Sequence, residues 1–214
     1  MSIRTTDKND RVMVFLDLAN VQLGLANHEG LENCITDHKD LATILIDGRK
    51  VAGAMAFDVK EYFNNNAETT DDLSDMGYKI VIGHMEDGKQ KEVDVALTVE
   101  MLMHAVRDHY DVAILVSGDR DFIPVISEVQ SLGKKVEVAS FSRYTSRRLI
   151  EISDKYTDLG SLPIVEYFEP DMIETYDQPD RLEIYDELEP VDTEEEFIDV
   201  FELIGAEEEF QEAN

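Results

Sequence analysis

The stretch DVAILVSGDRDF, residues 111–122, is the most informative part of this 214-residue chain for its fold class. Its first half is a short, continuous apolar run, which is typical of a strand buried on both faces of a parallel sheet. Two acids, Asp119 and Asp121, follow where such a strand ends. A second run of this kind, RVMVFLD at residues 11–17, also closes on an acid. Together the two runs predict a parallel sheet with carboxylates along the edge at which its strands end.

Strand-like and helix-like segments alternate between and around these two runs. Further strands are predicted at residues 50–57, 78–82 and 135–139. Helices are predicted at residues 20–27, 40–46, 71–76, 92–107, 121–131 and 145–153. In the longest helix, four residues form one apolar face, namely Val95, Val99, Leu102 and Val106. The alternation predicts an α/β fold in which a mostly parallel sheet is covered on both faces.

Acidic residues outnumber basic ones by 48 to 19, and the excess is concentrated towards the C-terminus. Residues 166–214 contain 20 acids and a single base, Arg181. We therefore expect an N-terminal arm (1–10), a folded domain (11–165) and an acidic extension with a short helix near residues 194–204. Three roles for the extension stay open: a docking arm for a protein partner, an internal mimic of RNA, or a solubilising tail.

Composition excludes several classes of protein. The single cysteine, Cys34, excludes a disulfide framework and a cysteine-rich zinc site. No apolar run approaches the ~20 residues that cross a bilayer, and the N-terminus lacks the apolar stretch of a signal peptide. We therefore expect a cytoplasmic protein without membrane contact, and the sequence is compatible with a homodimer. Salt adaptation is an alternative explanation for the net charge of −29.

Four carboxylates are expected near one edge of the sheet, namely Asp17, Asp94, Asp119 and Asp121. Such a group would repel itself without a cation, and hard oxygen ligands suit Mg²⁺ or Mn²⁺. Such an ion could activate water for attack on a phosphodiester. Each acid also has a simpler interpretation as a helix cap or as a partner of a helix dipole, so the spacing alone leaves both interpretations open.

The chain resembles the NYN domain family in three segments: MVFLDLANV (13–21), KEVDVALTVEML (91–102) and AILVSGDRDFIPVI (113–126). It is most similar to the LabA-like branch of bacteria and archaea, over residues 11–159. NYN domains belong to the PIN-like nuclease superfamily. The resemblance therefore implies a Rossmann-like three-layer α/β/α sandwich and metal-dependent cleavage of RNA.

By motif position, the resemblance also implies which residues form the active site. The metal ligands would be Asp17, Asp94, Asp119 and Asp121. Asn20 would be a neutral ligand or would orient water, and Ser117 would shape the tight SGD turn beside the RNA. Glu100 stands where similar domains often carry Asp, but it lies roughly 120° around the helix from Asp94 and is not expected to bind metal.

Cationic side chains are available to hold RNA beside these acids. The candidates are Arg143, Arg147 and Arg148, with Tyr144 for stacking, and Lys89 and Lys91 before the long helix. A solvated helix face is the simpler interpretation of the same arginines. The sequence thus predicts a metal-dependent ribonuclease. The alternatives are a catalytically weak or inactive NYN module that binds RNA or a protein partner in regulation, and a phosphatase or other phosphotransferase on a similar sheet.

Overall fold

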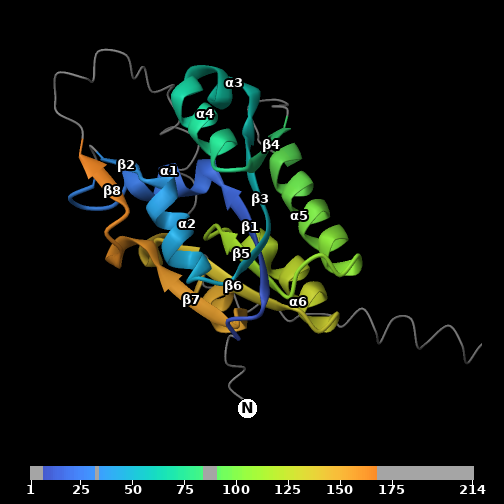
Figure 1. Cartoon of the computed structure of the whole chain (residues 1–214). Coiled ribbons are helices and arrows are strands. Elements are labelled where there is room, and N and C mark those ends of the chain that lie inside the picture. The colour runs from blue at the N-terminus through green and yellow to red at the C-terminus, as the bar shows by residue number, and fades with distance from the viewer. Residues whose placement is uncertain (1–6, 32–33, 84–90, 168–214) are drawn as a thin grey trace, which may run out of the picture. The chain divides into compact units, whose positions relative to one another are not determined.

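The computed structural model of the chain describes residues 7–31, 34–83 and 91–167 (Figure 1). The expected helix near residues 194–204 and Lys89 lie outside these ranges, and so does the side chain of Lys91. Among the helices that the structure describes, none is both long and apolar enough to span a bilayer.

Six strands form one central sheet, and every neighbouring pair in it is parallel. In spatial order they are β4 (Tyr78–Gly83), β3 (Lys50–Val59), β1 (Arg11–Asp17), β5 (Val112–Val116), β6 (Lys135–Ser140) and β7 (Lys155–Asp158). All five residues of β5 and six of the seven residues of β1 are buried. The predicted α/β fold with a mostly parallel sheet is confirmed. The short strand β7 was not predicted.

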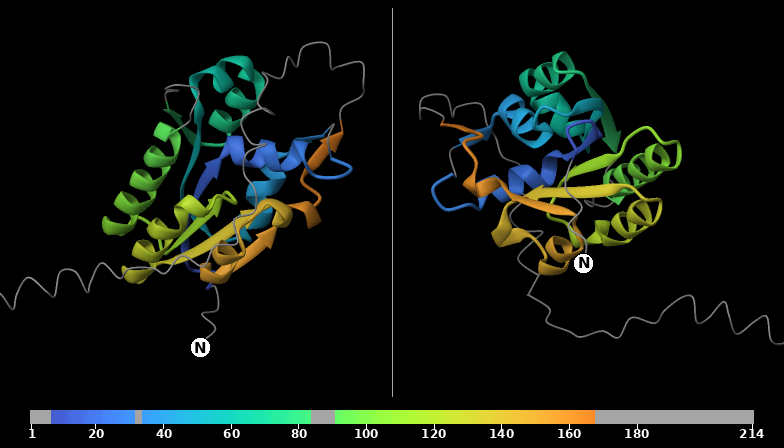
Figure 2. Two further views of the ribbon diagram at one scale, coloured as in Figure 1. Left: turned by 180° about the vertical axis from the view of Figure 1, so that it is seen from behind. Right: turned by 60° about the horizontal axis from the view of Figure 1, so that its bottom comes forward.

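Helices cover both faces of this sheet (Figure 2). They are α1 (Leu18–Ala26), α2 (His38–Ile46), α3 (Lys60–Asn65), α4 (Ala67–Asp75), α5 (Lys91–Val106), α6 (Ile123–Ser131) and α7 (Arg147–Ile152). In all three ribbon views α5 and α6 lie on one face, and α1 and α2 lie on the other. A separate antiparallel pair, β2 (Cys34–Thr36) and β8 (Val165–Tyr167), was not predicted because each strand is only three residues long.

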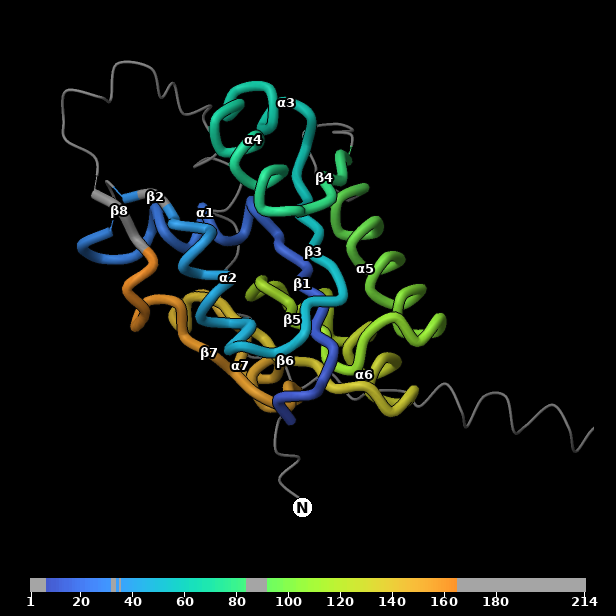
Figure 3. The backbone as a smooth tube through the Cα atoms, in the orientation of Figure 1, coloured from blue at the N-terminus to red at the C-terminus, as the bar shows by residue number. Residues whose placement is uncertain are grey.

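The order of the strands places a natural binding position between β1 and β5. The chain builds the sheet outward from β1 to β3 and β4, and then returns to add β5, β6 and β7 on the other side. The tube in Figure 3 shows β1 and β5 next to each other at the centre of the domain. In parallel sheets, ligands bind beyond the carboxyl ends of the strands where the strand order reverses in this way. Asp17 ends β1 at that point, and the turn at residues 117–119 follows β5.

The prediction that the apolar face of α5 packs against the sheet is wrong. Val95, Val99 and Val106 expose 61%, 52% and 59% of their surface. The residues packed into the core are Val93, Leu97, Met101 and Ala105, which also recur every four positions. The helix is apolar on two opposite sides, so hydrophobic periodicity alone could not select the side that faces the sheet.

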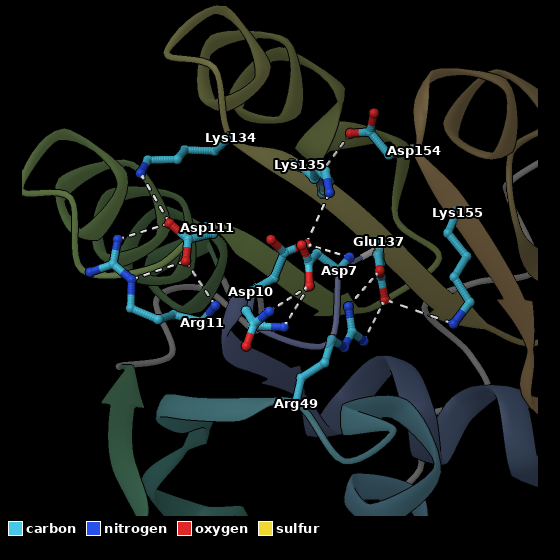
Figure 4. A network of polar contacts seen from close by, with 12 residues as sticks. Asp7, Asp10, Arg11, Arg49, Asp111, Lys134, Lys135, Glu137, Asp154 and Lys155 are labelled. Atoms are coloured by element: carbon cyan, nitrogen blue, oxygen red, sulfur yellow. Dashed lines mark hydrogen bonds and ion pairs between the residues drawn. The ribbon is translucent and has the colours of Figure 1, made fainter. Parts of the chain in front are cut away.

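The amino-terminal edge of the sheet is held together by buried and half-buried ion pairs (Figure 4). Arg49, just before β3, forms a two-pronged pair with Glu137 of β6, with N···O distances of 2.8 and 2.9 Å. Only 3% and 6% of these side chains are exposed. The Arg49 guanidinium also donates to the carbonyl oxygens of Leu45 and Ile46, so this buried charge is well hydrogen-bonded.

A second set of ion pairs joins the strands on the same edge. Arg11 at the start of β1 donates to both carboxylate oxygens of Asp111, which precedes β5, at 2.8 and 3.0 Å. The Arg11 guanidinium holds the pKa of Asp111 at about 2, well below its ordinary value. Lys135 of β6 pairs with Asp10 at 2.9 Å. These contacts therefore link the amino ends of β1, β5 and β6 (Figure 4).

Candidate active site

Asp17 is buried at the end of β1 and joins two elements through its two oxygens. Its Oδ1 accepts a hydrogen bond from the backbone N–H of Asn20 at 3.1 Å, so Asp17 caps helix α1. Its Oδ2 accepts a hydrogen bond from the Ser117 hydroxyl at 2.9 Å, across the gap to β5. The capping interpretation of Asp17 is therefore confirmed. The second bond shows that the same carboxylate also belongs to the edge between β1 and β5.

The SGD turn after β5 is fixed against α1 by side-chain hydrogen bonds. The backbone N–H of Gly118 donates to Oδ1 of Asn20 at 2.8 Å. The N–H of Asp119 donates to the Ser117 hydroxyl at 3.2 Å, and Oδ1 of Asp119 accepts from the N–H of Asp121 at 2.8 Å. Asn20 therefore uses its amide oxygen to hold the turn, and Asp119 is presented in a defined orientation.

The expectation that Ser117 lies beside RNA is corrected by its burial. Ser117 is 0% exposed, and its hydroxyl is placed between Asp17 and the backbone of Asp119. It therefore holds the Asp17 carboxylate and the backbone of the SGD turn, and it has no exposed surface to offer a substrate.

Gly118 allows the turn to pack closely against the arginine-bearing segment that follows β6. A Cβ atom at this position would lie 3.0 Å from Oγ1 of Thr145 and 3.3 Å from the carbonyl oxygen of Tyr144. Tyr144 is itself anchored, because its hydroxyl donates to the carbonyl oxygen of Asn27 at 2.7 Å. The segment at residues 142–148 is therefore held directly beside the acidic edge.

Three of the predicted carboxylates have a raised pKa, chiefly because they are removed from water. Burial raises the pKa of Asp17 to about 6, and the nearby charges of Asp58 and Asp119 add to the effect. Burial raises the pKa of Asp94 to about 7, and the charges of Asp17, Asp119 and Asp121 raise it further. Burial also raises the pKa of Asp119. Asp94, in the first turn of α5, thus shares an electrostatic environment with acids that lie more than 20 residues away in the chain.

These side chains do not form a closed cage of metal ligands. Within the described ranges, no three acidic, histidine or cysteine side chains lie close enough to hold one ion between them. The acids nevertheless fit a hard divalent cation that keeps part of its water shell, because Mg²⁺ is commonly bound through one or two carboxylates and several waters. Burial is the largest cause of each raised pKa, and carboxylates with pKa values shifted in this way are common at functional sites.

Asp58 is a site residue that the sequence reasoning missed. It lies near the carboxyl end of β3, is 0% exposed, and accepts a hydrogen bond from the N–H of Val59 at 2.7 Å. Its charge contributes to the raised pKa of Asp17. The signal was available, because Asp58 directly follows the apolar run at residues 50–57 just as Asp17 follows its own strand.

The predicted cationic rim is present in part. The Arg143 guanidinium carbon lies 5.9 Å from the centroid of the Tyr144 ring, and both residues are exposed. Arg148 is also exposed. Arg147 is engaged along its own helix, because its Nε pairs with Glu151 at 2.8 Å. Arg143 is therefore better placed than Arg147 to receive a phosphate.

With this geometry, residues 11–162 match the family model of the NYN domain. The chain belongs to the NYN domain family. NYN domains are part of the PIN-like nuclease superfamily, whose members generally use divalent metal ions. The match spans the whole sheet and includes all four predicted aspartates.

The NYN domain also resembles a solved structure. The crystal structure of a protein of unknown function from Vibrio parahaemolyticus has 24% sequence identity to this chain and a TM-score of 0.63. The similarity covers 72% of this chain and 96% of that chain. At this level of identity it supports the fold alone. No curated protein matches the chain significantly.

Proposed function

We propose that this NYN domain is a metal-dependent ribonuclease of the LabA-like branch. The observation that carries the proposal is the raised pKa of Asp17, Asp94 and Asp119 together with the position of Asp17 and the SGD turn where the strand order reverses. Buried and half-buried carboxylates are costly for a folded protein unless a cation or a proton neutralises them. Together with membership of a nuclease superfamily, this favours cleavage of a phosphodiester over simple recognition.

Each side chain has a distinct role in the proposed reaction. Asp17 and Asp119 would hold the ion, since hydrogen bonds from Ser117 and Asp121 fix their orientation. Asp94, in the first turn of α5, would add a third negative charge near the ion. A bound Mg²⁺ or Mn²⁺ would supply a Lewis acid for the phosphate and a nucleophilic water near neutral pH. Asp121 is exposed and would orient that water for in-line attack.

The RNA backbone would be held by the segment at residues 142–148. Arg143 and Arg148 offer guanidinium groups for phosphate oxygens, and the exposed ring of Tyr144 offers a surface for base stacking. Because the contact of Gly118 with Thr145 places this segment against the SGD turn, a phosphate bound there would lie beside the acids. Lys91 stays a candidate from its sequence position at the start of α5.

The direct test is a metal titration of RNA cleavage by the purified full chain. We expect no cleavage in the presence of a chelator and a rate that saturates with Mg²⁺ or Mn²⁺, because the carboxylates need a cation to engage a phosphodiester. Cleavage of labelled single-stranded RNA is measured by gel, with a mononucleotide substrate to expose phosphatase activity. Intact RNA at every concentration of either ion, combined with measurable RNA binding, would instead support the inactive binding module.

The raised pKa values of Asp17 and Asp94 predict a metal effect on stability that grows with pH. Because these folded-state pKa values, about 6 and 7, exceed the unfolded value near 4, the two groups lower the stability of the metal-free protein progressively between about pH 4 and pH 7. Divalent ions bind the ionised carboxylates, so the rise in melting temperature on adding Mg²⁺ should be small at pH 5 and large at pH 8.

This pH dependence is measured by thermal unfolding with and without the ion at each pH. The Asp94→Asn variant serves as the control, since it removes one of the titrating groups and should flatten the response. An equal effect of Mg²⁺ on the wild type at pH 5 and pH 8 would show that the ion binds elsewhere.

A further inference from the structure

The outward side of α5 presents an apolar stripe made of Val95, Val99, Met103 and Val106. These side chains are between 37% and 61% exposed. They lie within roughly 80° of one another around the helix, almost opposite the side that packs on the sheet. A helix that is apolar on both sides is expected to be covered on both sides. Four large apolar residues on one helix face differ from the scattered exposed residues that any protein carries.

We propose that this outer stripe is the interface of a weak homodimer in which two α5 helices pack antiparallel. The positions of the apolar residues are nearly symmetric along the helix. Antiparallel pairing about the midpoint between residues 100 and 101 places Val95 opposite Val106 of the second copy. It also places Val99 close to Met103 of the second copy. A two-fold interface requires self-complementarity of this kind. Each contact occurs twice in it, because the same surface of both copies takes part.

Charged residues at the two ends of the stripe fit the same arrangement. Glu92 in the first turn of α5 and Arg107, the residue that follows its last one, are both exposed. At 1.5 Å per residue, Glu92 lies ~13 Å from the midpoint in one direction and Arg107 lies ~10 Å from it in the other. Antiparallel packing therefore brings Arg107 of one copy near Glu92 of the other, at both ends of the pair. A parallel pair would bring like charges together at each end.

The charge and size of the surface predict how such a dimer behaves. Each chain has a net charge of −29, so two copies repel each other at long range. Salt screens this repulsion over a Debye length of ~10 Å at 0.1 M, whereas it strengthens burial of apolar surface. One helix face is also small compared with the ~800 Å² per partner of stable interfaces. We therefore expect a weak dimer that becomes tighter as the salt concentration rises.

Sedimentation of the full chain over a wide concentration range tests this dimer. The wild type should shift from monomer to dimer, and Val99→Glu should raise the dissociation constant at least tenfold, or ~1.4 kcal/mol. Val99 is half-exposed, so the variant should keep its fold and melting temperature. Thr43→Glu is the matched control, because it adds the same charge at an exposed position of α2, on the opposite face of the sheet.

A charge exchange tests the antiparallel arrangement itself. Arg107→Glu and Glu92→Arg should each weaken the dimer, and the double variant should recover most of the loss. A wild type that stays monomeric at all concentrations and salt levels would overturn the proposal, as would a dimer that is indifferent to Val99→Glu. A dimer that the double variant fails to restore would overturn the antiparallel packing. None of these outcomes depends on whether the chain cleaves RNA, because the stripe faces away from Asp94.

Discussion

The Asp119→Asn variant is expected to lose RNA cleavage by at least a hundredfold while keeping its fold. The amide retains an oxygen that can accept the hydrogen bond from the N–H of Asp121, so the SGD turn keeps its shape. The variant loses the negative charge that would bind the cation beside Asp17. Single-turnover cleavage at saturating Mg²⁺ measures the rate, and circular dichroism and thermal unfolding measure the fold.

Asp47→Asn is the matched control for this experiment. Asp47 is an exposed acid at the opposite edge of the sheet, and its φ of 51° is a conformation that asparagine tolerates well. The control should cleave RNA at the wild-type rate. If Asp119→Asn also cleaves at that rate, the acidic edge is not the reaction centre, and the proposed mechanism is wrong.

A large loss of stability is expected when the buried ion pair of Arg49 and Glu137 is broken. Glu137→Ala should lower the free energy of unfolding by ~3–5 kcal/mol, because it leaves a buried guanidinium without its counter-charge. Glu151→Ala is the comparison, since Glu151 also pairs with an arginine, Arg147, through a single contact of 2.8 Å. That pair is exposed, so its removal should leave the stability nearly unchanged.

Urea unfolding of both variants measures the difference, with the midpoint and slope reported separately. A double variant, Arg49→Met with Glu137→Leu, should recover much of the loss, because apolar residues of similar volume replace a buried ion pair at little net cost. Equal losses for Glu137→Ala and Glu151→Ala would show that burial of the pair contributes nothing.

Local patterns in the sequence were sufficient to predict five of the six strands of the central sheet, all except the four-residue strand β7. Buried parallel strands are continuous apolar runs, and those at residues 11–17 and 112–116 stand out because their ends are marked by acids. The short strands β2 and β8 could not be predicted, because a three-residue strand leaves no periodic signal and its partner is distant in the chain. The same limit applies to the orientation of α5, which depends on the rest of the protein.

The residues of the candidate site could be predicted from the sequence, but their relative positions and their burial could not. Asp17 and Asp119 follow from the rule that acids after parallel strands share an edge. Whether Asp94 lies near Asp17 and Asp119 depends on how α5 packs against the sheet, and no local sequence pattern specifies that packing. The resemblance implies that Ser117 lies beside the RNA, but a motif position does not specify how deeply a side chain is buried. The structure places Ser117 in the interior, between Asp17 and the backbone of Asp119.

The two edges of the sheet carry opposite kinds of electrostatics. The amino-terminal edge contains matched ion pairs such as Arg49 with Glu137 and Arg11 with Asp111. The carboxyl-terminal edge instead concentrates acids, and the charges of neighbouring acids add to the raised pKa of Asp94. Because the scaffold is secured at one end, the other end is free to diverge. Substitutions at the carboxyl-terminal edge could therefore change substrate preference during evolution. They would leave the ion pairs that stabilise the amino-terminal edge in place.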